Sequence, residues 1–377
     1  MSTRAPRLPA QSRRTPPRQR PDRPSSPAPI SNEKGDHMAG IKDVAEFCGV
    51  SLSTVSRTMT GSAPVAPETR KKVLQAVKKL NYKPNMTAKM LKTGGARLIG
   101  LIIPDIVNPY YPQIVKTLED LAMLAGYSII LCDAQGDVER EKNYFDALQR
   151  LCVDGILYVP STEDVEFVRE YAERVAMVII NRTFDINVPC ININDEEATY
   201  QAVHYLIEKG HSRIALYTNN THRQYNIKRM AGCIRAFEEA GITAYKPYVM
   251  ENLSEEDVYT KTMELMRRDV PPTAIFMFND SMALGVYRGI LDCGLRIPDD
   301  VSVMGFDDIP TAKYMAPPLT TIRHATYDSL KVIFNNLLYQ IESREFGEGS
   351  VTYFRAKLVE RDSVRDLNAQ TPPQMGA

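Results

Sequence analysis

Short apolar runs alternate with amphipathic stretches along most of this chain, beginning at Leu98. The runs are LIGLIIP, YSIILC, GILYVP, MVII, PCININ, RIALYT, AIFMF and VSVMGF. The helices expected between them cover residues 110–125, 137–150, 163–173, 195–209, 225–240, 255–268 and 280–293. Strands that are apolar throughout are buried on both faces, which is typical of parallel sheets covered by helices. Because the series resumes after PCININ, we expect two doubly wound parallel-sheet subdomains.

The ends of these strands predict a binding cleft. In doubly wound folds, ligands lie beyond the carboxyl ends of the strands, and a cleft between two sheets is the expected pocket. The polar residues that follow the apolar runs are Asp105, Asn108, Tyr110, Tyr111, Asn181, Arg182, Asn279, Asp280 and Asp307. They are candidates for binding a small molecule, although helix capping or salt bridging explains any one of them equally well.

Residues 41–61, with the sequence IKDVAEFCGVSLSTVSRTMTG, predict two short helices joined by a tight turn. The apolar side chains of the first helix share one face, which is therefore an interface. Gly49 supplies the backbone freedom for the turn, and Ser51 is placed to cap the second helix, expected at about 52–60. Val55 and Met59 would form the buried stripe of that helix.

The opposite face of the second helix predicts contact with DNA. A short helix rich in Ser and Thr is weakly stable by itself, so its hydroxyls are better explained by hydrogen bonds to phosphates and base edges. The guanidinium of Arg57 matches the O6 and N7 acceptors of guanine, and Leu52 can contact a thymine methyl. The predicted DNA contacts of this helix are Ser51, Leu52, Ser53, Thr54, Ser56 and Arg57. The alternative is an ordinary helical hairpin with an exposed Arg.

The segment PETRKKVLQAVKKLNYKPN predicts a third amphipathic helix, with Val73, Val77 and Leu80 on its apolar side and basic residues on the other. After Pro84, NMTAKMLKTGG is typical of about two turns of helix ended by two glycines. Two turns are not stable alone in water, so we expect this segment to fold only against a partner copy and DNA. It would then link DNA binding to the domain that follows.

Charge is divided along the chain although the total is zero. Residues 1–97 contain 19 Lys and Arg against 6 Asp and Glu, whereas residues 98–377 contain 27 against 40. A basic head on an acidic body indicates a polyanion partner for the head only. A solvated charged face remains the alternative for any single lysine.

The first 40 residues contain 8 Pro and 8 Lys or Arg but almost no large apolar side chain, so a disordered basic tail is expected at 1–40. This tail either contacts DNA weakly or precedes the true start at Met38. No secretory signal follows its arginines, and no apolar stretch is long enough to span a membrane. The six cysteines lack metal-binding spacing and indicate small core residues of a reduced, cytoplasmic protein.

Several segments together resemble the Lac repressor family of bacterial transcription regulators. They are DVAEFCGVSLSTVSR, PETRKKV, LNYKPN, ARLIGLIIPDIVNPYY, NIKRMAG, FNDSMALG, RIPDDVSVMGFDD and PPLTTIR, in register over about residues 41–365. The resemblance implies a helix-turn-helix head (41–84), a hinge helix and linker (85–97), and a periplasmic-binding-protein-like core for effector binding and dimerisation (98–365). The chain would cross between the two subdomains of the core near 194 and 323, and a flexible tail would cover 366–377.

The resemblance also implies roles for single residues. In the hinge, Leu91 would wedge into the minor groove, and Asn85, Ala88 and Lys89 would be further DNA contacts. In the core, a guanidinium and a carboxylate, those of Arg229 and Asp307, would clamp vicinal hydroxyls. The predicted effector contacts are Tyr110, Tyr111, Asn181, Arg182, Arg229, Asn279, Asp307 and His324.

The identity of the effector is less constrained. Where relatives often have an Asp before Arg182, this chain has Asn181. Two arginines without a flanking Asp, Arg182 and Arg229, would suit a carboxylated sugar. We therefore expect a sugar or a sugar acid.

These observations predict a sequence-specific DNA-binding transcription regulator, a repressor in the simplest case. It would be a homodimer on a pseudo-palindromic operator, controlled by a small carbohydrate-like effector. A corepressor-dependent or activating regulator is an alternative, whereas a free-standing sugar-binding protein would leave the basic head unexplained. No G-x-G-x-x-G after a strand, P-loop, H-E-x-x-H or G-x-S-x-G is present, so neither an enzyme nor a cofactor or metal is expected.

Overall fold

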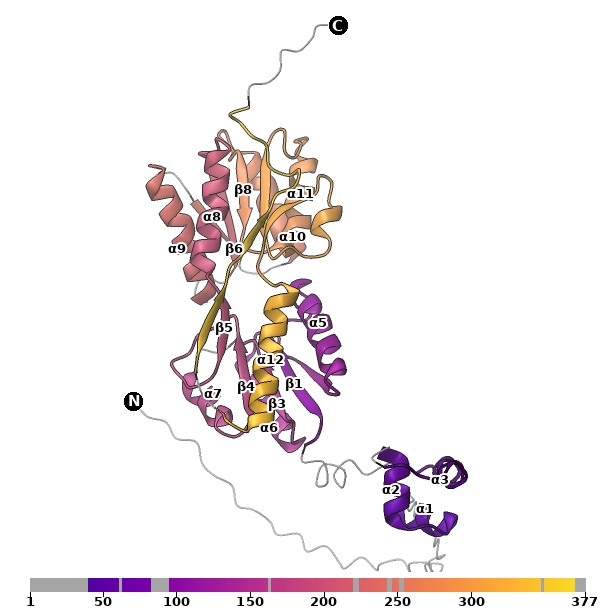
Figure 1. Ribbon diagram of the computed structural model, residues 1–377. Coiled ribbons are helices and arrows are strands. Elements are labelled where there is room, and N and C mark those ends of the chain that lie inside the picture. The colour runs from indigo at the N-terminus through magenta and orange to yellow at the C-terminus, as the bar shows by residue number, and fades with distance from the viewer. Residues whose placement is uncertain are drawn as a thin grey trace, which may run out of the picture. The chain divides into compact units, whose positions relative to one another are not determined.

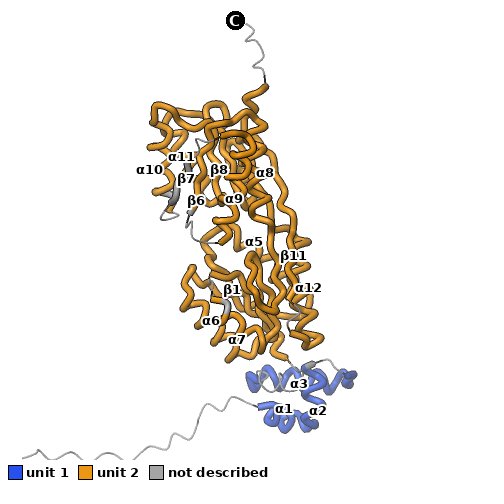
Figure 2. Tube along the Cα trace, turned by 90° about the vertical axis from the view of Figure 1, so that its left-hand side faces the viewer, with its two compact units in different colours: residues 1–85 blue, residues 86–377 orange. Residues whose placement is uncertain are grey.

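The computed structural model describes residues 40–60, 63–82, 95–161, 164–219, 224–242, 246–250, 254–346 and 349–369 of the 377-residue chain. The chain divides into two compact units, residues 1–85 and residues 86–377, which Figure 2 distinguishes by colour. Each unit has a hydrophobic core of its own.

The first unit contains three helices, α1 (Ile41–Cys48), α2 (Leu52–Thr60) and α3 (Pro67–Lys79). At the end of α1, Gly49 has φ +63°, and its N–H donates to carbonyls of the preceding turn. The core of this unit consists of Val44, Ala45, Val55, Val73 and Ala76. The predicted apolar faces of α1 and α2 are therefore confirmed. In α3, Val73 and Ala76 are fully buried, whereas the predicted apolar residues Val77 and Leu80 are only partly buried.

The second unit consists of two lobes, each built on a six-stranded sheet (Figure 1). Lobe 1 has the strand order β11-β5-β4-β3-β1-β2. Its strands are β1 (Leu98–Ile103), β2 (Ser128–Asp133), β3 (Gly155–Tyr158), β4 (Ala176–Ile180), β5 (Cys190–Ile193) and β11 (Val351–Phe354). Helices α5 (Tyr110–Leu124) and α12 (Tyr327–Ser343) pack on one face of this sheet, and α6 (Val138–Arg150) and α7 (Val165–Ala172) pack on the other.

Lobe 2 repeats this arrangement with the strand order β12-β10-β9-β8-β6-β7. Its strands are β6 (Ile214–Asn219), β7 (Lys246–Met250), β8 (Ala274–Met277), β9 (Ser302–Phe306), β10 (Thr320–Arg323) and β12 (Lys357–Val359). Helices α8 (Asp195–Glu208) and α9 (Gln224–Glu239) cover one face, and α10 (Glu255–Met266) and α11 (Ala283–Asp292) cover the other. Short 3₁₀ turns occupy Asp280–Met282 and Ala312–Tyr314. Among the described strand pairs, β10 with β12 is antiparallel and the others are parallel.

The predicted fold class, a helical head and a core of two doubly wound parallel sheets, is confirmed. The chain crosses between the lobes three times: from β5 to α8, from β10 to α12, and from β11 to β12. Figure 1 shows this last path running from lobe 1 to lobe 2. The sequence did not predict this third crossing, nor α12, β7, β10, β11 or β12. Within the described ranges, no helix combines the length and apolar character that crossing a bilayer requires.

Candidate functional site

The exposed side of α2 carries the residues predicted to contact DNA. Leu52 is 44% exposed, and Ser53 and Arg57 are exposed as well. The hydroxyl of Ser51 accepts a hydrogen bond from the backbone N–H of Thr54 at 3.2 Å, which caps the first turn of α2 as expected. Contact between these side chains and DNA stays a prediction.

The remaining hydroxyls of α2 differ in their accessibility. Thr54 and Ser56 are half-buried, and Thr58 is buried and donates to the backbone carbonyl of Thr54 at 2.9 Å. Such a bond satisfies the hydroxyl within the helix, so Thr58 serves the fold. The predicted hinge contacts Asn85, Ala88, Lys89 and Leu91 lie outside the described residues.

Helix α3 adds a basic surface to the same unit. Its exposed basic residues are Arg70, Lys71, Lys72, Lys78 and Lys79. They surround a buried apolar stripe, so the charge does not take part in the core. This arrangement suits long-range attraction to a phosphate backbone.

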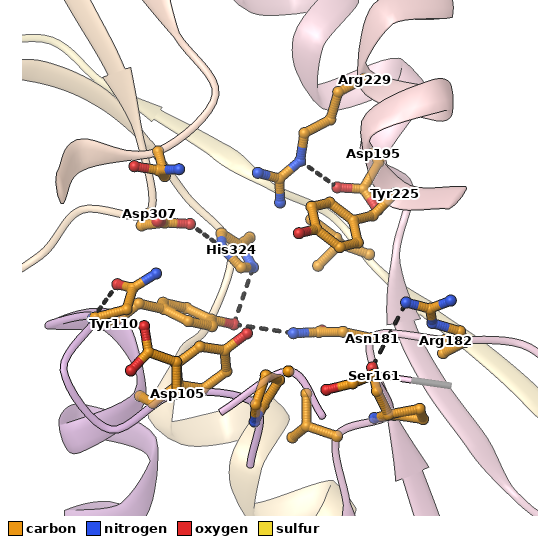
Figure 3. A pocket seen from close by; sticks show the side chains of 18 of the residues that line it. Asp105, Tyr110, Ser161, Asn181, Arg182, Asp195, Tyr225, Arg229, Asp307 and His324 are labelled. Carbon is orange, nitrogen blue, oxygen red and sulfur yellow. Dashed lines mark hydrogen bonds and ion pairs between the residues drawn. The ribbon is translucent and has the colours of Figure 1, made fainter. Parts of the chain in front are cut away.

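A cavity of about 490 Å³ opens between lobe 1 and lobe 2 (Figure 3). Its size lies within the range of small-molecule sites, roughly 300–1,000 Å³. The structure brings all the predicted effector contacts to its wall: Tyr110, Tyr111, Asn181, Arg182, Arg229, Asn279, Asp307 and His324. Asp105 and Asn108, the other candidates from the first strand end, line it too. Ligand binding by these residues stays a prediction.

Asp280, also named as a pocket candidate, does not line this cavity. It is 1% exposed, and its carboxylate accepts from the Thr321 hydroxyl at 2.8 Å and from the backbone N–H of Ile309 at 3.1 Å. Burial raises the pKa of this carboxyl well above its ordinary value. The carboxyl therefore ties the loop after β9 to β10, and the expectation of a pocket residue here was wrong.

The ion pair of Arg229 corrects a second expectation. Its Nε lies 2.8 Å from Oδ1 of Asp195, its guanidinium also donates to the carbonyl of Phe278, and its Cζ lies 3.8 Å from the centre of the Phe306 ring. Burial alone would lower the pKa of Arg229, but Asp195 and Asp307 outweigh it and hold the pKa above its ordinary value. The expectation that neither Arg182 nor Arg229 has an Asp beside it was wrong for Arg229, because Asp195 compensates the charge of that arginine.

The carboxylate of Asp307 is bonded to a different partner. Oδ1 of Asp307 lies 2.9 Å from Nε2 of His324, and Nδ1 of the same ring lies 3.2 Å from the hydroxyl of Tyr110. That hydroxyl accepts from the side-chain amide of Asn181 at 3.3 Å. Figure 3 shows this hydrogen-bonded chain along one wall of the cavity. Arg229 and Asp307 thus both line the cavity and interact through their charges. Each is already bonded to another side chain, Arg229 to Asp195 and Asp307 to His324.

Burial also determines the protonation states of Asp307 and His324. It raises the pKa of Asp307 to about 7, against the opposing charge of Arg229. Burial, reinforced by Arg229, lowers the pKa of His324 to about 3. His324 is therefore neutral over the physiological range.

The backbone at Asp307 is held in an unfavourable conformation. Its φ is +122°, and that of Asp308 is +54°, both in the region that L residues avoid. The carboxylate of Asp308 is bonded to Arg323 and to Arg361, which anchors the loop. A strained backbone conformation of this kind persists only where surrounding contacts hold it, and such residues are concentrated at ligand sites.

Several residues of the cavity wall were not predicted, among them Asp195 and Tyr225. Asp195 follows the carboxyl end of β5, so the rule applied to the other strands would have identified it. Tyr225 lies in the first turn of α9, away from any strand end, and carries no comparable signal in the sequence.

Comparisons with known proteins agree with this arrangement. The family described as "Bacterial regulatory proteins, lacI family" matches residues 40–85, and the "Periplasmic binding protein-like domain" matches residues 203–364. The HTH-type transcriptional repressor PurR of Histophilus somni is 36% identical over 334 residues, covering 88% of this chain and all of the relative. PurR of Haemophilus influenzae is 35% identical over 337 residues, with the same coverage.

Solved structures show the same likeness. The Lac repressor dimer bound to operator and the anti-inducer ONPF has a TM-score of 0.75 and 28% identity, covering 87% of this chain and 99% of that one. A LacI family regulator from Enterococcus faecium with bound ribose has a TM-score of 0.65 and 26% identity, covering 71% and 99%. The chain therefore belongs to the LacI family of bacterial regulatory proteins and is a DNA-binding transcriptional repressor.

Proposed function

We propose that a small, uncharged polyhydroxy compound, bound between lobes 1 and 2 of the core, changes the affinity of this repressor for its operator. The observation that carries the proposal is the convergence of polar residues from the strand ends of both lobes on one cavity of about 490 Å³. A ligand that contacts both lobes at once changes the free energy of one lobe arrangement relative to another.

The charges around Arg229 favour an uncharged ligand. Arg229 is compensated by Asp195, and the carboxyl of Asp307 adds further acceptor capacity. Neutral hydroxyls can donate to these carboxylates and accept from the guanidinium, whereas a ligand carboxylate would face two buried acids. A sugar therefore fits better than a sugar acid. The related regulator from Enterococcus faecium, solved with ribose, supports the same class.

Aromatic side chains favour a second candidate class, a planar nitrogen heterocycle. Tyr110, Tyr111 and Tyr225 all line the cavity. Their rings can pack on the face of a sugar or of a nucleobase. The hydroxyl donors of a sugar match the carboxylates better, so the heterocycle is the alternative outcome of the test.

The DNA-bound form is proposed to be a homodimer that reads a pseudo-palindromic site through two copies of α2. Arg57 would read guanine, with the hydroxyls of α2 and the basic residues of α3 positioning the helix on phosphates. The segment 85–92 would act as the hinge between head and core. Loss of operator affinity on ligand binding, induction, is the simplest arrangement, and corepression is the alternative.

Calorimetric titration of the full chain tests the ligand class. The panel pairs neutral sugars with their acids, ribose with ribonate and glucose with glucuronate, and adds adenine and guanine. We expect a neutral sugar to bind at least about tenfold more tightly than its acid, a difference of about 1.4 kcal/mol. Arg229→Gln should abolish that binding. Tighter binding of an acid contradicts the proposed ligand class, and binding of a purine alone selects the heterocycle.

A further inference from the structure

His324 lies at a place where the chain passes from one lobe to the other. It follows β10 of lobe 2 and precedes Thr326, whose hydroxyl caps the first turn of α12 in lobe 1 by accepting from the N–H of Ser329 at 3.2 Å. The ring is 4% exposed. It bonds to Asp307 after β9 of lobe 2 and to Tyr110 at the start of α5 in lobe 1. A single side chain therefore connects both lobes across the cleft.

The donors and acceptors that are hydrogen-bonded to His324 fix one tautomer of its ring. Above its pKa of about 7, Asp307 is ionised and only accepts, so Nε2 of His324 carries the proton and donates to it. The neutral ring has one N–H, so Nδ1 accepts from the hydroxyl of Tyr110. The amide of Asn181 in turn donates to the Tyr110 oxygen. Every bond then runs in the same direction, from Asn181 to Asp307.

The surroundings of the ring keep it neutral and in place. The Tyr110 ring stacks on it with 4.6 Å between centroids, and Phe306 lies at 5.1 Å. Besides Asp307, the charged groups that act on it are Arg229 from α9 and Asp195 from α8. With both ring nitrogens engaged, His324 is better placed to orient its neighbours than to bind a ligand itself.

We propose that His324 is a positioning residue that joins the two lobes: its Nε2–H orients the Asp307 carboxylate toward the cavity, and its Nδ1 holds the hydroxyl of Tyr110. Asp307 then offers a ligand its second oxygen, and Tyr110 offers its ring, because its hydroxyl proton is already used. A ligand that bonds to Asp307 and shifts it would, through His324, move the segment that leads into α12. This inference rests on the proposed function only in assuming that Asp307 and Tyr110 face the effector.

Nitrogen NMR of the full chain with ¹⁵N-labelled histidine tests the tautomer directly. The sequence contains five histidines, and the spectrum of His324→Gln identifies the signals of this one. At about pH 8, where Asp307 is ionised, we expect a protonated Nε2 and an unprotonated Nδ1. Down to about pH 5.5 the ring should stay neutral, although an ordinary histidine titrates in this range. Tyr110→Phe should shift the Nδ1 signal and leave the proton on Nε2. An averaged signal at about pH 8, a doubly protonated ring above about pH 5.5, or no response to Tyr110→Phe overturns the proposal.

Hydrogen exchange of the same variants separates positioning from simple packing. Glutamine carries a donor and an acceptor and can replace both bonds of the ring, whereas leucine can replace neither. We expect amide exchange around residues 325–330 to rise about tenfold in His324→Leu and Tyr110→Phe, and to stay within about threefold in His324→Gln. Equal effects of Gln and Leu show that the ring only fills space and overturn the proposal.

These results are independent of the proposed function. If the tautomer and the exchange pattern are as expected but no neutral sugar binds, the ligand class fails and the positioning role stands. If a sugar binds but the tautomer is not fixed, the positioning role fails.

Discussion

The guanidinium of Arg229 on α9 is bonded to the carboxylate of Asp195, the first residue of α8, with 2.8 Å between Nε and Oδ1. Both side chains are about 10% exposed and line the cavity between the lobes. The two helices thus supply a charge-balanced pair to the site. Under the proposed function, this pair would allow a cavity with buried charges to bind an uncharged ligand.

Breaking this pair from one side should be costly. Arg229→Ala leaves Asp195 buried without its partner, so we expect the free energy of unfolding to fall by about 3–5 kcal/mol, as for other buried ion pairs. The double variant Arg229→Ala with Asp195→Ala should recover a large part of that loss. Urea denaturation of the three proteins measures both effects, and additive losses would show that the two residues do not interact.

Arg57 is expected to supply specificity and not only charge. Arg57→Ala should weaken binding to a selected operator by about 1–3 kcal/mol, roughly 5- to 150-fold, and leave most binding to random DNA. Arg57→Lys is the matched control, because it keeps the charge and loses the planar fork. Its operator affinity should fall nearly as far, while its salt dependence should equal that of the unmodified chain. Full operator affinity in Arg57→Lys would exclude bidentate base reading.

Gly232 allows α8 and α9 to approach closely. A Cβ at this position would lie 2.0 Å from the carbonyl oxygen of Glu196 and 2.3 Å from the Thr199 hydroxyl. Helix propensity alone favours alanine, yet Gly232→Ala should lower the free energy of unfolding by about 1–3 kcal/mol or more through overpacking. The neighbouring exposed position provides the control, since Ala231→Gly should cost about 1 kcal/mol through propensity. A stabilised Gly232→Ala protein would contradict the close packing.

The buried histidine predicts a pH dependence of stability. Because burial and Arg229 lower the pKa of His324 to about 3, the unfolded chain gains a proton below about pH 6.5 that the folded chain does not. The difference in unfolding free energy between the unmodified chain and His324→Gln should therefore rise by about 1 kcal/mol per pH unit from about pH 4.5 to 6.5, and then level off.

The raised pKa of Asp307 has the opposite sign, since it removes stability as the pH rises toward about 7, but it is present in both proteins. His204→Gln, at an exposed position, is the control and should follow the unmodified chain within about 0.5 kcal/mol. Parallel profiles for His324→Gln and the unmodified chain would mean that His324 takes up its proton normally.

The parts of the fold that the sequence predicted are those in which consecutive residues are apolar and therefore buried. Apolar runs such as LIGLII become central strands because both of their faces are covered, and the polar residues after them reach the cavity because parallel strands end at one edge. The strands that were missed lack such a pattern. For example, β7 contains Lys246 and Pro247, and β12 is three residues long and depends on pairing with β10.

The site was predicted as a set of positions but not as a set of bonds. Strand ends identified Asp307, and the family likeness identified Arg229, yet neither shows that these residues pair with His324 and Asp195. Those pairings depend on the close approach of α8 to α9 and on the crossing after β10. Both are tertiary features that separate the partners in sequence.

Ligand binding in the cleft between the lobes is proposed to change the affinity of the helix-turn-helix head for operator DNA. The most direct test of this proposal is the operator affinity of the full chain, measured by fluorescence anisotropy with and without a saturating mixture of the neutral sugars, for the unmodified protein and for Arg229→Gln. The account predicts a change of about tenfold or more in the unmodified protein and of about twofold or less in the variant. An unchanged affinity in the unmodified protein, or an equal change in both, would contradict it.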